Sequence, residues 1–208
     1  MRRRAAATEA LCVFGLVMLD IWWLRFHFPW AWTLILALVI ASQMARGETL
    51  KSLGFRWDNL QEGLKIVLPF LLLVCAVALV AGGLFRTIRN VRSDNAILSF
   101  GYYCFWGLFQ EYVLNGYFTN RVGAFSRRPT AHRTALWAAA LFSAAHLPNW
   151  FLMLITLAGG YLSARFYLAY RNLFVLGLAH GAIGSILYLV VPESISHHLY
   201  VGPKWFQH

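Results

Sequence analysis

Three titratable residues, Glu111, His146 and His180, lie in three different apolar segments of the chain. Each is far from the ends of its segment, where an ionisable side chain costs roughly 3 kcal/mol on membrane-insertion scales. A carboxylate and two imidazoles, one on each of three helices, are side-chain types that activate water or bind metal. We therefore take these three residues as candidate catalytic residues of a site within a membrane.

The residues around Glu111 extend this candidate site along one helix. Asn115 lies four residues after Glu111, so both side chains share a helix face, whereas Gln110 points about 100° away. Burial favours proton uptake by a carboxylate, which makes Glu111 a candidate general base. Asn115 is either a supporting residue of the site or a residue that hydrogen-bonds between helices.

The two histidines have neighbours that suit a packed site. Phe142 precedes His146 by one helical turn on the same face, where its ring can separate the imidazole from lipid. Gly177 and Gly184 lie three and four residues from His180, and small residues at these positions allow close helix packing or leave space for an extended peptide.

Composition places these residues in an all-α, polytopic transmembrane bundle. Of the residues, 60% are hydrophobic and 12% are charged, and the mean hydropathy is +0.58. We expect one integral-membrane domain over residues 1–208, with about seven spans and six to eight possible. The expected spans are approximately 8–24, 30–45, 64–85, 96–119, 134–147, 149–164 and 172–191.

Basic residues at the ends of the apolar segments predict the orientation. They favour a cytoplasmic N-terminus. We expect the protein in a cell membrane, namely a prokaryotic plasma membrane. The basic residues of the expected inner segments are Arg2, Arg3, Arg4, Arg46, Lys51, Arg56, Lys65, Arg121, Arg127, Arg128, Arg133, Arg165 and Arg171. Those of the outer segments are Arg25, Arg86, Arg89, Arg92 and Lys204. Because the net charge of +10 comes from these positions, the charge indicates contact with the lipid bilayer and no nucleic-acid partner.

This topology also predicts that the three candidate residues meet. Glu111, His146 and His180 lie about 9 to 13 residues from inner basic markers, or roughly 14–20 Å along a helix. We therefore expect the three side chains at one depth in the membrane.

The ordered segments Gln110-Glu111-x-x-x-Asn115, Phe142-x-x-x-His146 and His180-x-x-x-Gly184 resemble the motifs of the CAAX protease and bacteriocin-processing (CPBP) family. The usual forms in that family are Glu-Glu-x-x-x-Arg, Phe-x-x-x-His and His-x-x-x-Asn. The resemblance implies a glutamic-type intramembrane endopeptidase that uses no cofactor and has a catalytic core at about 96–191. By position it implies that His146 helps to activate water and that His180 stabilises the oxyanion. Glu111 aligns with the family's second glutamate, and a modest rotation of its helix would bring it into the position of the base. Substrates would be membrane-associated or C-terminally processed peptides.

Three positions depart from the family motifs and leave alternatives open. Asn115 occupies the place of the arginine in the first motif. Gln110 occupies the place of the family's first glutamate, and Gly184 occupies the place of the asparagine, which Asn149, Asn115 or Ser185 would have to replace. One alternative is a catalytically silent relative that acts as a membrane scaffold or immunity-like factor. Another is a zinc protease with the ligands Glu111, His146 and His180, although the chain lacks a His-Glu-x-x-His segment. A proton-coupled transporter is a further alternative, which the lack of internal repeats disfavours.

Overall fold

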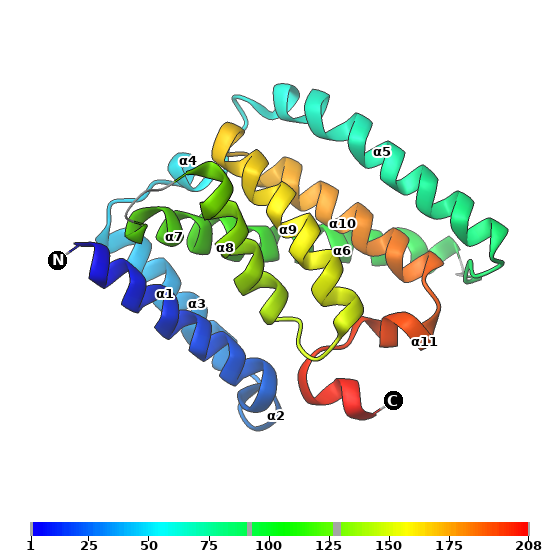
Figure 1. Ribbon diagram of the computed structural model, residues 1–208, viewed down its shortest axis with the longest axis horizontal. Coiled ribbons are helices and arrows are strands. Elements are labelled where there is room, and N and C mark those ends of the chain that lie inside the picture. Colours follow the sequence, from blue (N-terminus) through cyan, green and yellow to red (C-terminus); the bar gives the residue numbers. More distant parts are fainter. Residues whose placement is uncertain (1, 91–92, 127–129, 208) are drawn as a thin grey trace.

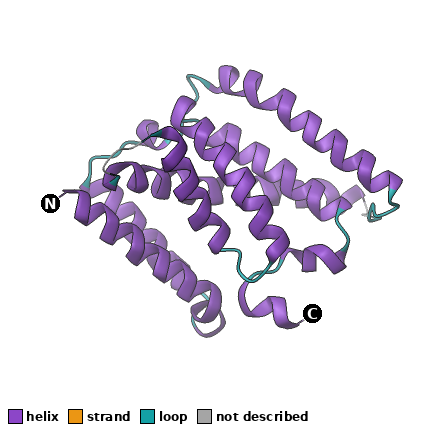
Figure 2. Cartoon of the chain, in the orientation of Figure 1, coloured by secondary structure: helices purple, strands orange, loops and turns teal. Residues whose placement is uncertain are grey.

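The computed structural model describes residues 2–90, 93–126 and 130–207, and every regular element in these ranges is a helix (Figure 2). The predicted all-α fold class is therefore confirmed. The longer elements are α1 (Arg2–Leu19), α3 (Ala31–Ala45), α5 (Leu60–Leu84), α6 (Ser93–Glu111), α8 (Ala131–Ala144), α9 (Trp150–Tyr170) and α10 (Leu173–Val190). The shorter ones are η1 (Asp20–Leu24), α2 (Arg25–His27), α4 (Leu50–Leu53), η2 (Tyr112–Thr119), α7 (Asn120–Phe125), α11 (Glu193–Ser196), η3 (His197–Leu199) and η4 (Gly202–Gln207).

Four helical segments are long and apolar enough to cross a membrane, which indicates a multi-pass membrane protein. They are Arg3–His27, Leu60–Leu84, Trp150–Tyr170 and Leu173–Val190. Each of the seven expected spans coincides with a helix, but α3 and α8 have only 15 and 14 residues. Helix α6 carries Gln110 and Glu111 and continues through η2 and α7, so its segment is more polar than the four candidates.

Several predicted boundaries differ from the helix ends. The helices expected from residues 8, 64 and 134 begin at Arg2, Leu60 and Ala131, and two C-terminal ends also differ. The segment expected at 149–164 continues to Tyr170, because a helix-breaking residue is lacking there and an arginine such as Arg165 can remain exposed on a helix. The segment expected at 134–147 ends at Ala144, where Asn149 begins the next helix as its N-cap. Arg92, Arg127 and Arg128, which contribute to the predicted orientation, lie outside the described residues.

Helix α6 lies behind α9 and α10 in the view of Figure 1 and packs along α10, and η2 continues it into contact with α8, α9 and α10. The hairpin of α1 and α3 lies at one side of the molecule, and α5 lies at the opposite side against α10. Helices α8 and α9 form a second pair that contacts η2. The end of α6 is therefore surrounded by α8, α9 and α10, the helices that carry the remaining candidate residues.

Glycines bring α6 and α10 into backbone contact. A Cβ atom added at Gly181 would lie 2.5 Å from the Cα atom of Cys104 on α6. One added at Gly107 would lie 2.9 Å from the carbonyl oxygen of Gly177 and 3.1 Å from the Cβ atom of His180. Since real Cβ atoms do not approach so closely, only glycine fits at these crossings. This close packing sets the position of His180 relative to α6.

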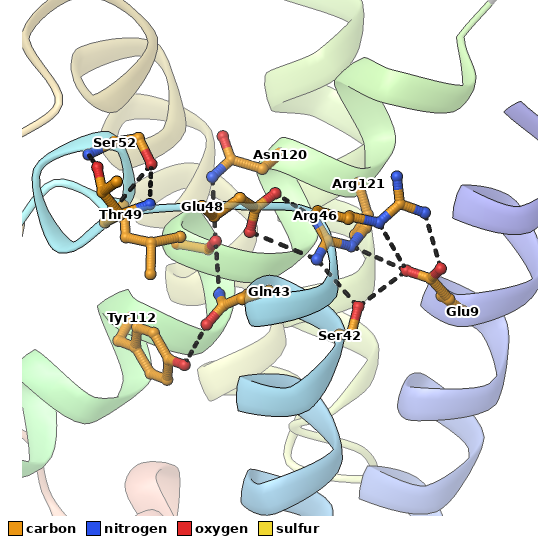
Figure 3. A network of polar contacts seen from close by, with 12 residues as sticks. Glu9, Ser42, Gln43, Arg46, Glu48, Thr49, Ser52, Tyr112, Asn120 and Arg121 are labelled. Atoms are coloured by element: carbon orange, nitrogen blue, oxygen red, sulfur yellow. Dashed lines mark hydrogen bonds and ion pairs between the residues drawn. The ribbon is translucent and has the colours of Figure 1, made fainter. Parts of the chain in front are cut away.

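A buried polar network ties the N-terminal hairpin to the rest of the bundle (Figure 3). The Arg121 side chain on α7 is 1% exposed and donates to Glu9 at 3.2 Å, to Glu48 at 2.6 Å and to Ser42 at 3.0 Å. Arg46 also binds Glu9, at 2.7 Å. Two guanidinium groups therefore face two carboxylates, so the buried charge of Arg121 is paired.

A second part of this network fixes the helix that carries Glu111. The Tyr112 hydroxyl donates to Gln43 Oε1 on α3 at 2.6 Å, and Gln43 Nε2 donates to the Gly116 carbonyl at 3.1 Å (Figure 3). Gln43 is buried, so each of its two side-chain functions has a partner on η2. These contacts restrict rotation of η2 about its own axis.

Candidate active site

Glu111 and His180 form the centre of the candidate site. Glu111 is the last residue of α6 and is 3% exposed, and His180 lies midway along α10. Their side chains meet with Glu111 Oε1 2.9 Å from His180 Nδ1. The structure thus brings together two residues that are 69 positions apart in the sequence.

The second carboxylate oxygen of Glu111 has two donors. Asn115 Nδ2 donates to Glu111 Oε2 at 2.7 Å, and the Ser163 hydroxyl of α9 donates to the same oxygen at 2.5 Å. Asn115 Nδ2 also donates to Ser163 Oγ at 2.8 Å, and Thr119 Oγ1 donates to Asn115 Oδ1 at 3.0 Å. The predicted common face of Glu111 and Asn115 is present, although Asn115 lies in the π-helix η2.

These contacts suit an ionised carboxylate. Amide N–H groups only donate, so both Asn115 contacts have a fixed direction. An ionised carboxylate only accepts, so His180 must donate from Nδ1. A neutral His180 then has its lone pair on Nε2, directed away from Glu111. Glu111 therefore selects the tautomer in which His180 can accept a proton.

His146 lies near this pair, and the ring of Phe142 contacts both histidines. The ring centroid of Phe142 is 4.8 Å from that of His146 and 6.0 Å from that of His180. His146 Nδ1 is 2.7 Å from the Phe142 carbonyl oxygen, which only accepts, so this nitrogen donates and leaves Nε2 as the free position. Among the described residues, no hydrogen bond joins His146 to Glu111, so the direct partner of Glu111 is His180.

The side chain of Asn149 bonds to the backbone of α9 and of the C-terminal segment, not to Glu111 or His180. Its Oδ1 accepts from the Leu152 N–H at the start of α9, and its Nδ2 donates to the carbonyls of Ser196 and Tyr200 at 2.9 and 3.0 Å. Its side chain is fully buried, and both of its amide hydrogens have partners. Asn149 therefore fixes the C-terminal segment and caps α9.

Gln110 and Gly184 also lie apart from the carboxylate contacts. Gln110 is half-buried and makes no side-chain hydrogen bond with any described residue. A Cβ atom at Gly184 would lie 3.2 Å from the ring of Tyr103, which fills the space beside this glycine. Ser185 donates to the Gly181 carbonyl of its own helix at 2.8 Å.

The geometry gives the zinc alternative no support. In the described part of the chain, no three His, Cys, Asp or Glu side chains come together in a way that could hold a metal ion. Glu111 and His180 are in contact, but His146 is turned toward the Phe142 carbonyl.

A family model for Rce1-like type II CAAX prenyl endopeptidases matches residues 92–186. The chain contains a CPBP family domain. The match confirms the resemblance inferred from the three motifs. Neither a curated protein nor a solved structure matches the chain significantly. The match of residues 92–186 suggests an intramembrane protease.

The hydrogen-bonded residues Glu111, Asn115, Thr119, Ser163 and His180, called the polar array below, all lie in the CPBP domain. This domain overlaps the predicted core of 96–191. The N-terminal hairpin and α5 lie outside it and pack around it. The Arg121 network therefore joins the CPBP domain to the segment that precedes it in the chain.

Ser163 and Thr119 are two members of the array that were not predicted from the sequence. Ser163 is a small polar residue inside the apolar segment of α9, and Thr119 follows Asn115 by four residues. Polar side chains within apolar helices commonly hydrogen-bond between helices, and this signal could have identified Ser163. Its partner could not be known without the packing of α9 against η2.

Proposed function

We propose that the CPBP domain is a metal-free intramembrane endopeptidase in which Glu111 and His180 together activate water. The observation that carries this proposal is the 2.9 Å contact between Glu111 Oε1 and His180 Nδ1, within the segment that matches the family. It differs from the motif-based expectation in that His180, rather than His146, is the direct partner of the carboxylate.

The proposed reaction uses the free Nε2 atom of His180. Nε2 takes a proton from water, and the oxygen of that water adds to the carbonyl carbon of the scissile peptide bond. The carbon–nitrogen bond then breaks, and the proton on Nε2 passes to the leaving amine. Glu111 holds the imidazole in the accepting tautomer and stabilises the imidazolium that forms. His146 Nε2 is free to accept a hydrogen bond from the water and so to orient it.

The proposal includes a single integral-membrane domain with seven spans and a cytoplasmic N-terminus. Contacts among the basic connections support it: Arg171 donates to the Ser52 carbonyl at 2.9 Å, and Arg46 binds Glu9 near the start of α1. These groups therefore gather at one end of the bundle, as the positive-inside rule requires. The substrate is a peptide or protein segment at the membrane, and the family name supports a C-terminal prenylated segment as the first probe.

The test is cleavage of a farnesylated peptide that ends in a CAAX sequence, and of its unprenylated counterpart, by the full chain in detergent. Glu111→Gln and His180→Gln are expected to lower kcat at least 100-fold. Glu62→Gln and His27→Ala are matched controls, because both residues are exposed and distant in sequence from the site. Cleavage is expected to resist a chelator, since the proposed reaction needs no metal.

Gln110 separates the proposal from the silent alternative. Because Gln110 makes no contact with the array, Gln110→Glu is expected to leave cleavage within a few-fold of the wild type. Cleavage that requires Gln110→Glu would contradict the proposal and favour a silent relative. Wild-type cleavage that a chelator abolishes would instead favour the zinc alternative.

A further inference from the structure

Ser163 is the only residue of α9 that hydrogen-bonds to Glu111 among the described residues. Its hydroxyl donates to Glu111 Oε2 and accepts from Asn115 Nδ2, so it closes a triangle of hydrogen bonds with these two residues. Gly160, one turn earlier on α9, would place a Cβ atom only 3.2 Å from the Phe142 ring. Helix α9 therefore packs closely on α8 at Gly160, one turn from the point where the short side chain of Ser163 reaches Glu111.

The hydrogen bonds of this array all point toward the carboxylate. Thr119 donates to Asn115, Asn115 donates to Ser163 and to Glu111, and Ser163 donates to Glu111. Asn115 has no acceptor on Nδ2, so the Ser163 proton cannot point back toward it. The Ser163 hydroxyl accepts a hydrogen bond from Asn115, so its own proton is directed to Glu111 Oε2.

The two carboxylate oxygens of Glu111 have different hydrogen-bond partners. Oε2 faces Ser163 and Asn115, whereas Oε1 faces His180. A carboxylate with one anchored oxygen cannot rotate about its Cγ–Cδ bond without losing both anchoring bonds. Hydrogen bonds to an ionised acceptor are stronger than neutral ones, so the anchor also stabilises the charge in an apolar surrounding.

We propose that Ser163 is a positioning residue that holds Glu111 ionised and directs its Oε1 atom to His180. The role deepens the proposed function, since it concerns the residue that orients the water-activating pair. Ser163 itself does not touch the reacting atoms. Its contribution passes through the orientation and charge of Glu111.

The first experiment measures the charge state of Glu111 without requiring catalysis. Dicyclohexylcarbodiimide modifies protonated carboxyl groups in apolar surroundings, and mass spectrometry locates the modified residue. With the full chain in detergent at pH 8, Ser163→Ala is expected to raise the rate of modification at Glu111 roughly tenfold, because the carboxylate loses one donor. Ser163→Thr retains the hydroxyl and is expected to restore the wild-type rate. Ser163→Cys, with its weak donor, is expected to lie between.

Thr156→Val is the matched control for these variants. Thr156 is a buried hydroxyl residue on the same helix, and it donates to the Leu152 carbonyl at 2.6 Å rather than to Glu111. Its substitution is expected to leave the modification rate at Glu111 unchanged. An equal rise in Thr156→Val and Ser163→Ala, or no rise in Ser163→Ala, would overturn the proposed role of Ser163.

The second experiment compares kcat and KM for the farnesylated peptide. Ser163→Ala is expected to lower kcat roughly tenfold with KM unchanged, and Ser163→Thr is expected to recover kcat. A rise in KM alone would show that Ser163 shapes the substrate site instead. If the wild type cleaves neither peptide, the proposed function fails for these substrates, while the modification rates still decide whether Ser163 controls Glu111.

Discussion

Replacing Gly181 with alanine should separate α6 from α10 and thereby break the contact between Glu111 and His180. The added Cβ atom would lie 2.5 Å from the Cα atom of Cys104 and 2.7 Å from its backbone nitrogen. Ordinary van der Waals contact begins at 3.4 Å, so the two backbones must move apart by about 0.9 Å. The distance of 2.9 Å between Glu111 and His180 would then approach about 3.8 Å, beyond hydrogen-bonding range.

The expected cost in stability follows from overpacking. Forcing one methyl group into a packed contact costs about 1–3 kcal/mol, which corresponds to a fall in melting temperature of roughly 3–10 °C. A displacement of about 1 Å in the site should also lower kcat roughly 100-fold. Gly159→Ala is the matched control, since a Cβ atom there has no neighbour within 4 Å. Both substitutions gain the same helix propensity, so their difference isolates the packing term.

The measurements are thermal unfolding in detergent and cleavage of the farnesylated peptide. We expect Gly181→Ala to melt below Gly159→Ala. We also expect Cys104→Ala to leave the defect of Gly181→Ala in place, because the clash involves the backbone of Cys104. Equal melting temperatures for the two glycine variants would refute the backbone contact, and rescue by Cys104→Ala would assign the clash to the Sγ atom.

Two other substitutions test contacts that hold the site from outside. Arg121→Met should destabilise the fold by about 3 kcal/mol, because it leaves Glu48 without its buried partner. Thermal unfolding should show no such loss for exposed Arg133→Met, and equal losses would contradict a specific role of the buried pair. Asn149→Ala should cost about 1–2 kcal/mol, because the cap and both bonds to the C-terminal segment are lost. It should also speed chymotrypsin cleavage within the C-terminal segment 192–207, for example at Tyr200. Asn149→Asp keeps the capping oxygen and should speed that cleavage with a smaller loss of stability, whereas wild-type proteolysis rates in both variants would refute the contact.

Much of the architecture could be predicted from hydropathy. Apolar segments of suitable length predicted the seven main helical segments, because burial of nonpolar surface in lipid or protein requires such segments. The helix ends at Ala144 and Tyr170 were not predicted, since helix ends depend on caps such as Asn149 and Asn172 whose partners come from other parts of the fold.

The sequence by itself determined which polar residues lie within apolar helices and which share a helix face. Glu111 and His180 were therefore predicted as site residues, and the common face of Glu111 and Asn115 was predicted because spacing within a helix fixes the relative direction of side chains. Spacing says nothing about how two helices are rotated against each other. Only the tertiary structure decided that His180 rather than His146 contacts Glu111 and that Ser163 completes the array. The physical reason lies in the glycine contacts of α6 with α10 and of α9 with α8, which set the distance and rotation of each helix.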